Sequence, residues 1–433
     1  MILIYSHKIT NRLKYIFEVI FIDILKTDVT FTSNSEEFEK SDLPKINYSN
    51  QKLSSGLFFQ SSQLLFETGI KEQNITISNF KNYPCFYSVG KESHFTFDVF
   101  AASFYLVSRY EEYLPQIRDA HDRFTAKESL AFQHNFLKFP IVNIWANFIS
   151  NSIEETYPNF KFPKSKFEYT STIDIDNAFA YKHKGILRIT GGLIKAFLKG
   201  NDFRDRVNVL LNKENDPYDT YQYQFEAHKK YNIKPIYFFL LGDYALNDKN
   251  IPVKNKNFQS LIKSISDYYE VGIHPSYSSN NDAKILTKEI HRLQSITHRN
   301  INKSRQHFLK LSLPYTYRNL IDNDITHDYT MGYSGQSGFR ASICSPYKFY
   351  DLDNESLTNL TIVPFCVMEA TYKYYLEKTP GEALTDILEL IETVKSVNGN
   401  FISVWHNESL SDKGIWNGWR NVYEEMLKKV TIK

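Results

Sequence analysis

The sequence predicts an α/β protein, with a distorted (β/α) barrel of about seven strands in the C-terminal part and a small α/β domain before it. Two observations lead to this prediction. Beyond residue 166, short apolar runs alternate with helical patterns about seven times, and repeated βα units build a parallel sheet. Before residue 160, a strand, a helix and a second strand follow one another within the first 32 residues. An open doubly wound sheet is the alternative to the barrel.

The N-terminal region begins with the apolar run ILIYS, which predicts a buried strand at residues 2–6. Thr10 is positioned to cap a helix over residues 11–25, and residues 28–32 predict the second strand. Apolar residues at helical spacing predict two further helices, over 97–114 and 139–157.

The domain boundary is expected in the segment 157–166, where Pro158 and Pro163 lie among polar residues. We therefore expect an accessory α/β domain over residues 1–160 and the barrel domain over residues 167–433. The predicted barrel strands are 167–175, 234–242, 268–274, 304–311, 327–333, 360–369 and 400–406. The helices predicted between and after them are 257–269, 283–296, 382–397 and 417–430.

Composition and charge exclude several classes of protein. A net charge of +2 over 433 residues gives no basic field that would attract nucleic acid. Three scattered cysteines without CxxC spacing argue against a disulfide framework or a zinc ribbon. The apolar N-terminal stretch contains Glu18 and Asp23 and lacks a cleavage site, and no run approaches the roughly 18 residues of a membrane span. We expect a cytoplasmic protein.

A basic and apolar segment, residues 182–200, interrupts the first βα unit. Lysines and an arginine among Ile, Leu and Phe suit an anionic membrane surface, so peripheral membrane contact is one interpretation. The other is an inserted helical flap packed over the barrel. Gly191 and Gly192 weaken a continuous amphipathic helix.

Polar side chains fall at the ends of most predicted barrel strands. In parallel barrels, catalytic groups collect at the carboxyl ends of the strands, because the loops there build the pocket. Strand alternation puts Asp174 and Asp176 on one face. Two neighbouring carboxylates repel each other unless a cation or a hydrogen-bond donor compensates them. The other polar residues at or near strand ends are His274, Arg305, His307, Asp328, Glu369 and His406.

The motifs around these residues resemble those of the polysaccharide deacetylases, carbohydrate esterase family 4, whose catalytic domain is a distorted (β/α) barrel. The matching segments, in the family's order within residues 168–433, are STIDID, EVGIHPSYS, SRQHF, HDYTMGY and VWHN. The region before residue 160 resembles the N-terminal domain of some bacterial deacetylase-like proteins, through LLFETGI, FDVFAASFYLVSRYEEYL and DAHDRFTAKES.

The resemblance implies a hydrolase acting on a non-peptide carbon–nitrogen bond. Its substrate would be an N-acetylated sugar or glycan precursor in surface-polysaccharide or glycoconjugate metabolism. Asp174 would be the general base, held by Arg305 through a charge-assisted hydrogen bond. His406 would be the general acid that protonates the leaving nitrogen, with Asp328 as the carboxylate that orients it.

The resemblance also implies a divalent metal, zinc being the expected ion, and here the sequence departs from the family. The family's ligands are one aspartate and two histidines. Asp176 and His274 match two of them, whereas Ser278 stands in place of the second histidine. His307, two residues beyond the arginine on the same predicted strand face, is one substitute, and Glu369 is the alternative third ligand. A site without a third protein ligand is the remaining possibility.

Loss of the metal would leave other function classes open. The barrel would then be a carbohydrate-binding or assembly protein. A metal-free glycoside hydrolase is the other alternative, with Asp174 and Glu369 as its carboxylate pair.

Overall fold

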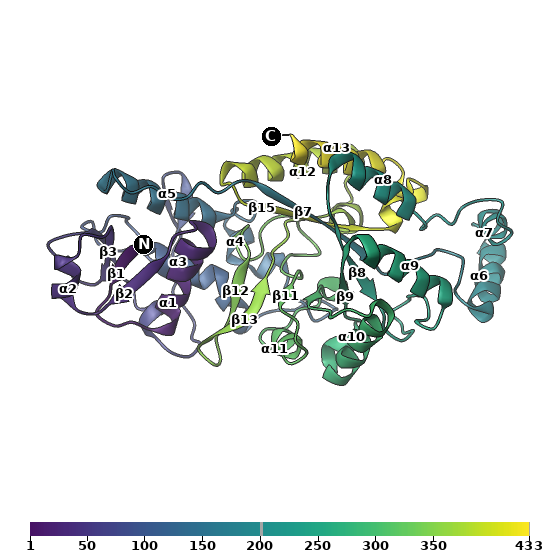
Figure 1. Ribbon diagram of the computed structural model, residues 1–433, viewed down its shortest axis with the longest axis horizontal. Helices are drawn as coiled ribbons and strands as arrows, with labels where there is room; N and C mark the ends of the chain where they lie inside the picture. The colour runs from purple at the N-terminus through teal and green to yellow at the C-terminus, as the bar shows by residue number, and fades with distance from the viewer. Residues whose placement is uncertain (200–201, 433) are drawn as a thin grey trace.

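The computed structural model describes residues 1–199 and 202–432, so Gly200 of the segment 182–200 and Lys433 of the predicted barrel domain lie outside the described residues. The chain forms two main sheets, one toward each end of the long axis (Figure 1). A four-stranded sheet belongs to the N-terminal region and a nine-stranded sheet to the C-terminal region. The predicted α/β class is confirmed.

The N-terminal sheet is parallel throughout, in the order β2-β1-β3-β4. Its strands are β1 (Ile2–Tyr5), β2 (Val29–Thr32), β3 (Lys45–Ser49) and β4 (Leu57–Gln60). A hairpin of β5 (Ser78–Phe80) and β6 (Tyr83–Cys85) lies apart from it. The helices of this region are α1 (Asn11–Glu18), α2 (Ser35–Lys40), α3 (Val99–Val107), α4 (Leu130–Gln133) and α5 (Ile141–Thr156).

Local interactions explain where two predicted helices begin and end. The Thr10 side chain accepts a hydrogen bond from the backbone N–H of Leu13, which confirms it as the N-cap of α1. The chain continues beyond α1 as a π-helical turn, Val19–Ile24. The prediction over 97–114 was too long, because Arg109 adopts a left-handed φ of 56° and ends the helix after α3.

The C-terminal sheet has the strand order β12-β13-β11-β10-β9-β8-β7-β15-β14. Neighbouring strands are parallel from β13 to β14, and β12 pairs antiparallel with β13. The strands are β7 (Glu168–Ile175), β8 (Ile236–Leu240), β9 (Glu270–His274), β10 (Lys303–Ser304), β11 (His327–Asp328), β12 (Tyr347–Asp351), β13 (Ser356–Ile362), β14 (Val367–Met368) and β15 (Asn400–His406).

The segment 363–366 bridges the two ends of the parallel sheet and makes it a distorted barrel. The backbone N–H of Val363 donates to the carbonyl of Asp328, the last residue of β11, whereas that of Cys366 donates to the carbonyl of Ile402 in β15. Alternate residues of the strands face an interior apolar cluster that is separate from the main core. The members of this cluster are Ile236, Phe238, Leu309, Tyr329, Val363, Phe365, Met368, Ile402 and Val404.

The helices of the C-terminal region lie around the strands, except that α6 and α7 stand apart at the end of the long axis (Figure 1). The four predicted helices are found as α9 (Lys256–Tyr268), α10 (Ala283–Thr297), α12 (Pro380–Ser396) and α13 (Trp419–Thr431). The others are α6 (Ile186–Lys199), α7 (Phe203–Leu210), α8 (Tyr221–Tyr231) and α11 (Tyr315–Ile321).

Three predicted strands were wrong in extent. Only β10 remains of 304–311, because the chain turns at Phe308 and Leu309, both in the left-handed region. Only β11 remains of 327–333. The strand predicted over 360–369 is divided between β13 and β14, and the hairpin of β12 and β13 was missed.

Apolar and ionic contacts join the N-terminal and C-terminal regions. One continuous cluster of buried apolar residues extends through both. Glu112 accepts hydrogen bonds from Arg109 and from Arg340, and all three side chains are at most 2% exposed. The buried pair of Glu112 and Arg340 therefore compensates opposite charges across the junction. The division into domains at residues 160–167 stays a prediction.

Two further predictions concern the cysteines and the possible membrane spans. Cys85, Cys344 and Cys366 are buried free thiols. Among the described residues, no helix combines the length and apolar character needed to cross a bilayer.

Candidate active site

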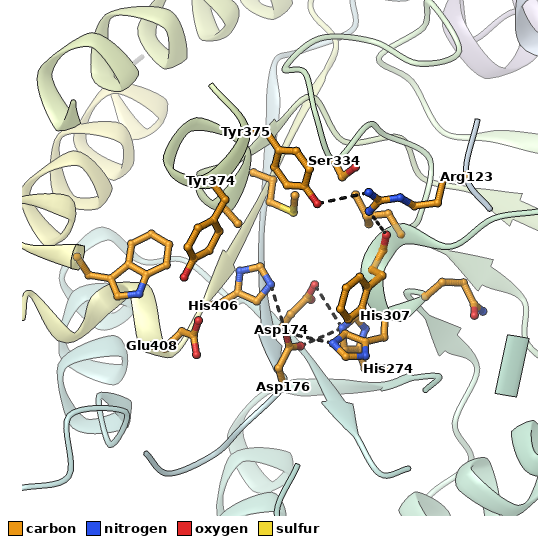
Figure 2. A pocket seen from close by; sticks show the side chains of 16 residues that line it. Arg123, Asp174, Asp176, His274, His307, Ser334, Tyr374, Tyr375, His406 and Glu408 are labelled. Carbon is orange, nitrogen blue, oxygen red and sulfur yellow. Dashed lines mark hydrogen bonds and ion pairs between the residues drawn. The ribbon is translucent and has the colours of Figure 1, made fainter. Parts of the chain in front are cut away.

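A cavity of about 220 Å³ opens at the carboxyl ends of the barrel strands (Figure 2). Five of the residues predicted from the sequence line it: Asp174, Asp176, His274, His307 and His406. The other three predicted residues, Arg305, Asp328 and Glu369, are fully buried. The fold thus brings residues more than 230 positions apart in the sequence to one place.

Asp176, His274 and His307 form a cluster with the composition of a metal site. One ligand atom from each residue lies within 4.8 Å of the other two. Nε2 of His274 lies 3.1 Å from Oδ1 of Asp176, and Nε2 of His307 lies 3.4 Å from Oδ2. Figure 2 shows both imidazole rings close to Asp176 at the floor of the cavity. Three protein ligands beside an open cavity are typical of catalytic zinc.

Hydrogen bonds determine which ring nitrogen faces Asp176. Nδ1 of His274 lies 2.5 Å from the carbonyl oxygen of Arg305, and Nδ1 of His307 lies 3.0 Å from Oδ1 of Asp248. Both oxygens are acceptors, so each Nδ1 carries a hydrogen and, in the neutral ring, each Nε2 directs a lone pair at the Asp176 carboxylate. Such outer hydrogen bonds are characteristic of histidines that bind metals.

The Asp176 carboxylate completes the fit to a cation. Its Oδ1 atom is buried and has no hydrogen-bond partner within residues 1–199 and 202–432. Two imidazole lone pairs and a carboxylate repel one another unless a positive charge lies between them. The donor set of two nitrogens and a carboxylate oxygen suits zinc or a related divalent ion.

The charges of the cluster shift its pKa values in opposite directions. Burial alone would raise the pKa of Asp176, but His307 and His274 hold that pKa well below its usual range. Burial alone would lower the pKa of His307, but the carboxylates of Asp176 and Asp248 raise it to about 9. When no cation is bound, His307 therefore carries a second proton, on the Nε2 atom that faces Oδ2 of Asp176.

Ser278 lies behind the ligand cluster, where it supports Asp248. The backbone N–H and the hydroxyl of Ser278 both donate to Oδ2 of Asp248 at 3.3 Å, and the N–H of Tyr277 donates to Oδ1 at 2.8 Å. Asp248 in turn fixes the His307 ring. Ser278, where the resemblance led us to expect a histidine ligand, thus supports the carboxylate that holds His307.

His307 reaches the cluster from a turn, so its predicted place on a strand face was wrong. The backbone N–H of Arg305 donates to Ile273, and that of His307 donates to Pro275, both at 3.1 Å. The turn therefore runs beside the end of β9, which carries His274. This pairing brings the two imidazole rings to a centroid distance of 5.1 Å.

Arg305 holds Asp174 from inside the barrel. Its Nη1 atom donates to Oδ1 of Asp174 at 2.9 Å and to the Thr172 hydroxyl at 2.7 Å. The guanidinium lies over the Phe238 ring, 4.8 Å from its centroid. A Cβ added at Gly272 would lie 2.5 Å from the same ring, so this glycine makes room for it. The other oxygen of Asp174 stays 4.0 Å from Nε2 of His274.

Glu369 orients His406. Oε1 of Glu369 lies 2.8 Å from Nδ1 of His406 and accepts the backbone N–H of the same residue. Burial opposes the charged imidazole, but Glu369 and then the two aspartates of the cavity raise the pKa of His406 well above its usual value. His406 therefore carries a proton and points it into the cavity, 3.9 Å from Oδ2 of Asp176.

The prediction that Asp328 orients His406 was wrong. Asp328 accepts hydrogen bonds from the Ser304 hydroxyl at 2.6 Å and from the backbone and hydroxyl of Thr330 at 2.9 and 2.8 Å. These bonds tie β10 to β11 inside the barrel. Glu369, predicted as an alternative metal ligand, occupies the orienting position instead.

Several cavity residues escaped the sequence analysis. Arg123 comes from the N-terminal region, pairs with Asp119 at 2.7 Å and donates to the carbonyl of Phe308 at 2.8 Å. The aromatic residues Tyr374 and Trp416, with ring centroids 5.4 Å apart, form part of the opposite wall. Arg123 lies in the segment DAHDRFTAKES, which was noted only as a feature of the N-terminal region.

One family model matches the N-terminal region of this chain. Residues 2–158 match the model of a family of unknown function, DUF7033. Curated proteins include no detectable sequence relative of the chain.

Solved structures give several partial likenesses. One is a putative polysaccharide deacetylase from Mycobacterium smegmatis, with 14% identity and a TM-score of 0.41 over 63% of this chain and 86% of that one. Others are Puue allantoinase, with 7% identity, a TM-score of 0.40 and coverage of 61% and 84%, and a probable polysaccharide deacetylase from Pseudomonas aeruginosa PAO1, with 7% identity, a TM-score of 0.39 and the same coverage.

Proposed function

We propose that this protein is a metal-dependent hydrolase that removes the acetyl group from an N-acetylated sugar or glycan precursor. The observation that carries the proposal is the pair of imidazole rings whose Nε2 atoms face Asp176 at 3.1 and 3.4 Å, beside the ion pair of Arg305 and Asp174. Asp176, His274 and His307 would hold the divalent ion, zinc being the best match to the donor set. When bound, such an ion supplies Lewis-acid polarisation of a carbonyl oxygen and a more acidic water.

Asp174 is assigned the role of general base. Its Oδ1 accepts from Arg305, which leaves Oδ2 free to take a proton from the attacking water. Arg305 is a positioning residue, because its guanidinium is 0% exposed and reaches the cavity only through Asp174. Its positive charge also compensates the buried Asp174 carboxylate.

His406 is assigned the role of general acid. Glu369 holds its ring through Nδ1, so that Nε2 carries the proton facing the cavity. As the water oxygen bonds to the acetyl carbon and the carbon–nitrogen bond breaks, this proton passes to the departing nitrogen. The products are acetate and a free amino sugar.

The walls of the cavity favour a sugar as substrate. Tyr374, Tyr375 and Trp416 supply aromatic surface around the polar floor, and Arg123 brings a donor from the N-terminal region. The cavity is smaller than the roughly 300–1,000 Å³ of pockets that enclose whole drug-sized ligands. It has room for the acetamido-bearing end of a substrate. We propose residues 1–160 as an accessory domain that completes this wall, in a cytoplasmic enzyme of surface-polysaccharide or glycoconjugate synthesis.

The glycoside-hydrolase alternative has less support. It needs the carboxylates of Asp174 and Glu369 to face the substrate together. Glu369, however, is 0% exposed, and its carboxylate is hydrogen-bonded to His406. A carbohydrate-binding or assembly protein is the second candidate, since the same cavity would bind a sugar without turnover.

Acetate release from a panel of free, nucleotide-linked and oligomeric N-acetylglucosamine, measured with zinc-loaded protein, tests the proposal. We expect release from at least one member and none from the Asp174→Asn variant. Binding of a panel member by the zinc-loaded protein without acetate release would favour the second candidate.

A further inference from the structure

Helix α6 exposes an unusually large apolar surface. Five of its large apolar side chains are 62 to 88% exposed: Ile186, Leu187, Ile194, Phe197 and Leu198. At 3.6 residues per turn, positions 187, 194 and 198 fall in one row, with 186 and 197 beside them. The five therefore form a single stripe along the helix. The flap interpretation, in which this surface packs over the barrel, is contradicted, and α6 continues through Gly191 and Gly192.

The rest of the protein holds the opposite side of α6. Ala196 is buried, and Ile189 and Leu193 are half-buried. The Arg188 guanidinium donates to the backbone carbonyls of Lys249 and Asn250 and lies 4.3 Å from the centroid of the Tyr244 ring. These contacts fix the rotation of the helix about its axis, so the exposed apolar stripe is directed away from the protein. Figure 1 shows α6 at the end of the long axis.

The charge around the stripe is strongly one-sided. Residues 182–210 contain seven Lys or Arg and two Asp, a net charge of +5, whereas the whole chain carries +2. Within α6 the ionisable residues are all basic, and Lys195 is exposed. A second copy of the chain would bring an equal positive charge to the same stripe and be repelled.

We infer that α6 is an interfacial helix that lies on an anionic lipid bilayer. The apolar face inserts among the acyl chains, while the exposed basic residues near it, such as Lys195 and Arg204, meet lipid phosphates. The inference does not depend on the proposed enzymatic activity. The protein would then be a peripheral membrane protein, attached through a helix that is too short to cross the membrane.

Sedimentation of the full-length protein with vesicles of phosphatidylcholine and phosphatidylglycerol, and with vesicles of phosphatidylcholine alone, tests the inference. We expect binding to the anionic vesicles that weakens as salt is raised. Leu187→Glu and Leu198→Glu should each lower the affinity about tenfold or more, because each removes one buried leucine from the lipid. Ile117→Glu is the matched control: Ile117 is 74% exposed in the N-terminal region, and this variant should bind as the unsubstituted protein does.

Three outcomes would overturn the inference. One is the absence of binding to anionic vesicles. Another is equal binding by the α6 variants and the control. The third is a dimer in solution, without vesicle binding, that Leu187→Glu dissociates. Because the substituted side chains are 77 and 88% exposed, the melting temperature of each variant should match that of the unsubstituted protein, so loss of binding is not loss of fold.

Discussion

Nδ1 of His307 lies 3.0 Å from Oδ1 of Asp248, a residue that no motif of the sequence indicates. Asp248 is fully buried and also accepts hydrogen bonds from Tyr277 and Ser278. Its carboxylate thus links the loop after β9 to the turn that carries His307. Ser278 and His307 are therefore two parts of one arrangement around Asp248.

Asp248→Asn should weaken metal binding about 10- to 100-fold, the usual effect of losing a partner outside the ligand shell. The amide keeps the shape of the carboxylate but removes the charge that fixes the His307 ring. Titration of the metal-free protein with zinc against a competing chelator measures the change. Asp243→Asn, on an exposed carboxylate five residues before Asp248, is the control, and an equal loss in both variants would contradict the assignment.

Asp174→Asn should abolish acetate release, a loss of at least about 100-fold for removing a general base, and leave the zinc content unchanged. The reason is that Asp174 lies outside the ligand cluster and is held by Arg305. Metal analysis and the acetate assay are made on the same preparation. Loss of zinc together with activity would mean that Asp174 is a ligand and that the roles of the two aspartates are exchanged.

Glu369→Gln should lower kcat about 10- to 100-fold, because the neutral amide no longer supports the protonated His406 ring. Asp328→Asn is the informative comparison, since it alters the carboxylate that the sequence indicated for this role. We expect that variant to lose thermal stability and to keep kcat within a few-fold. A larger kcat effect at Asp328 than at Glu369 would contradict the assignment.

Glu289 gives a prediction about pH and stability. This fully buried carboxyl accepts the N–H of Ser276, and burial raises its pKa from 4.5 to about 7. Below pH 4.5 the group is protonated in the folded and the unfolded protein. As the pH rises from 4.5 to 7, the unfolded chain ionises first, so folding loses on the order of 2–3 kcal/mol.

Glu289→Gln should remove this loss, because glutamine stays neutral at every pH. Urea denaturation at pH 4.5 and pH 7.5 measures the difference. The variant should gain stability relative to the unsubstituted protein at the higher pH. A difference between the two proteins that does not change with pH would contradict the raised pKa.

The sequence was most informative where chemistry and local pattern coincide. The strand β7 with Asp174 and Asp176, β9 with His274 and β15 with His406 were all predicted within a few residues. Each combines a regular apolar run with a polar residue at its carboxyl end. Thr10 was likewise predicted correctly as the N-cap of α1.

The parts of the site that the sequence did not predict depend on contacts between segments that are distant in the sequence. His307 turns into the cluster because its backbone pairs with Pro275, and Glu369 meets His406 only because β14 pairs with β15. Asp328 looked equivalent to Glu369 in the sequence, since each is a carboxylate within a predicted barrel strand. Arg123 enters the cavity through the packing of the N-terminal region on the barrel. The spacing of residues within one segment gives no information about contacts between segments that are distant in the sequence.

The metal content of the purified protein tests the central claim most directly. Protein prepared without chelator should contain about one equivalent of zinc or a related divalent ion, and His307→Ala should lose most of it. His291→Ala, at an exposed position of α10, should retain it. Full acetate-releasing activity in protein without bound metal, or unchanged occupancy in His307→Ala, would contradict the account.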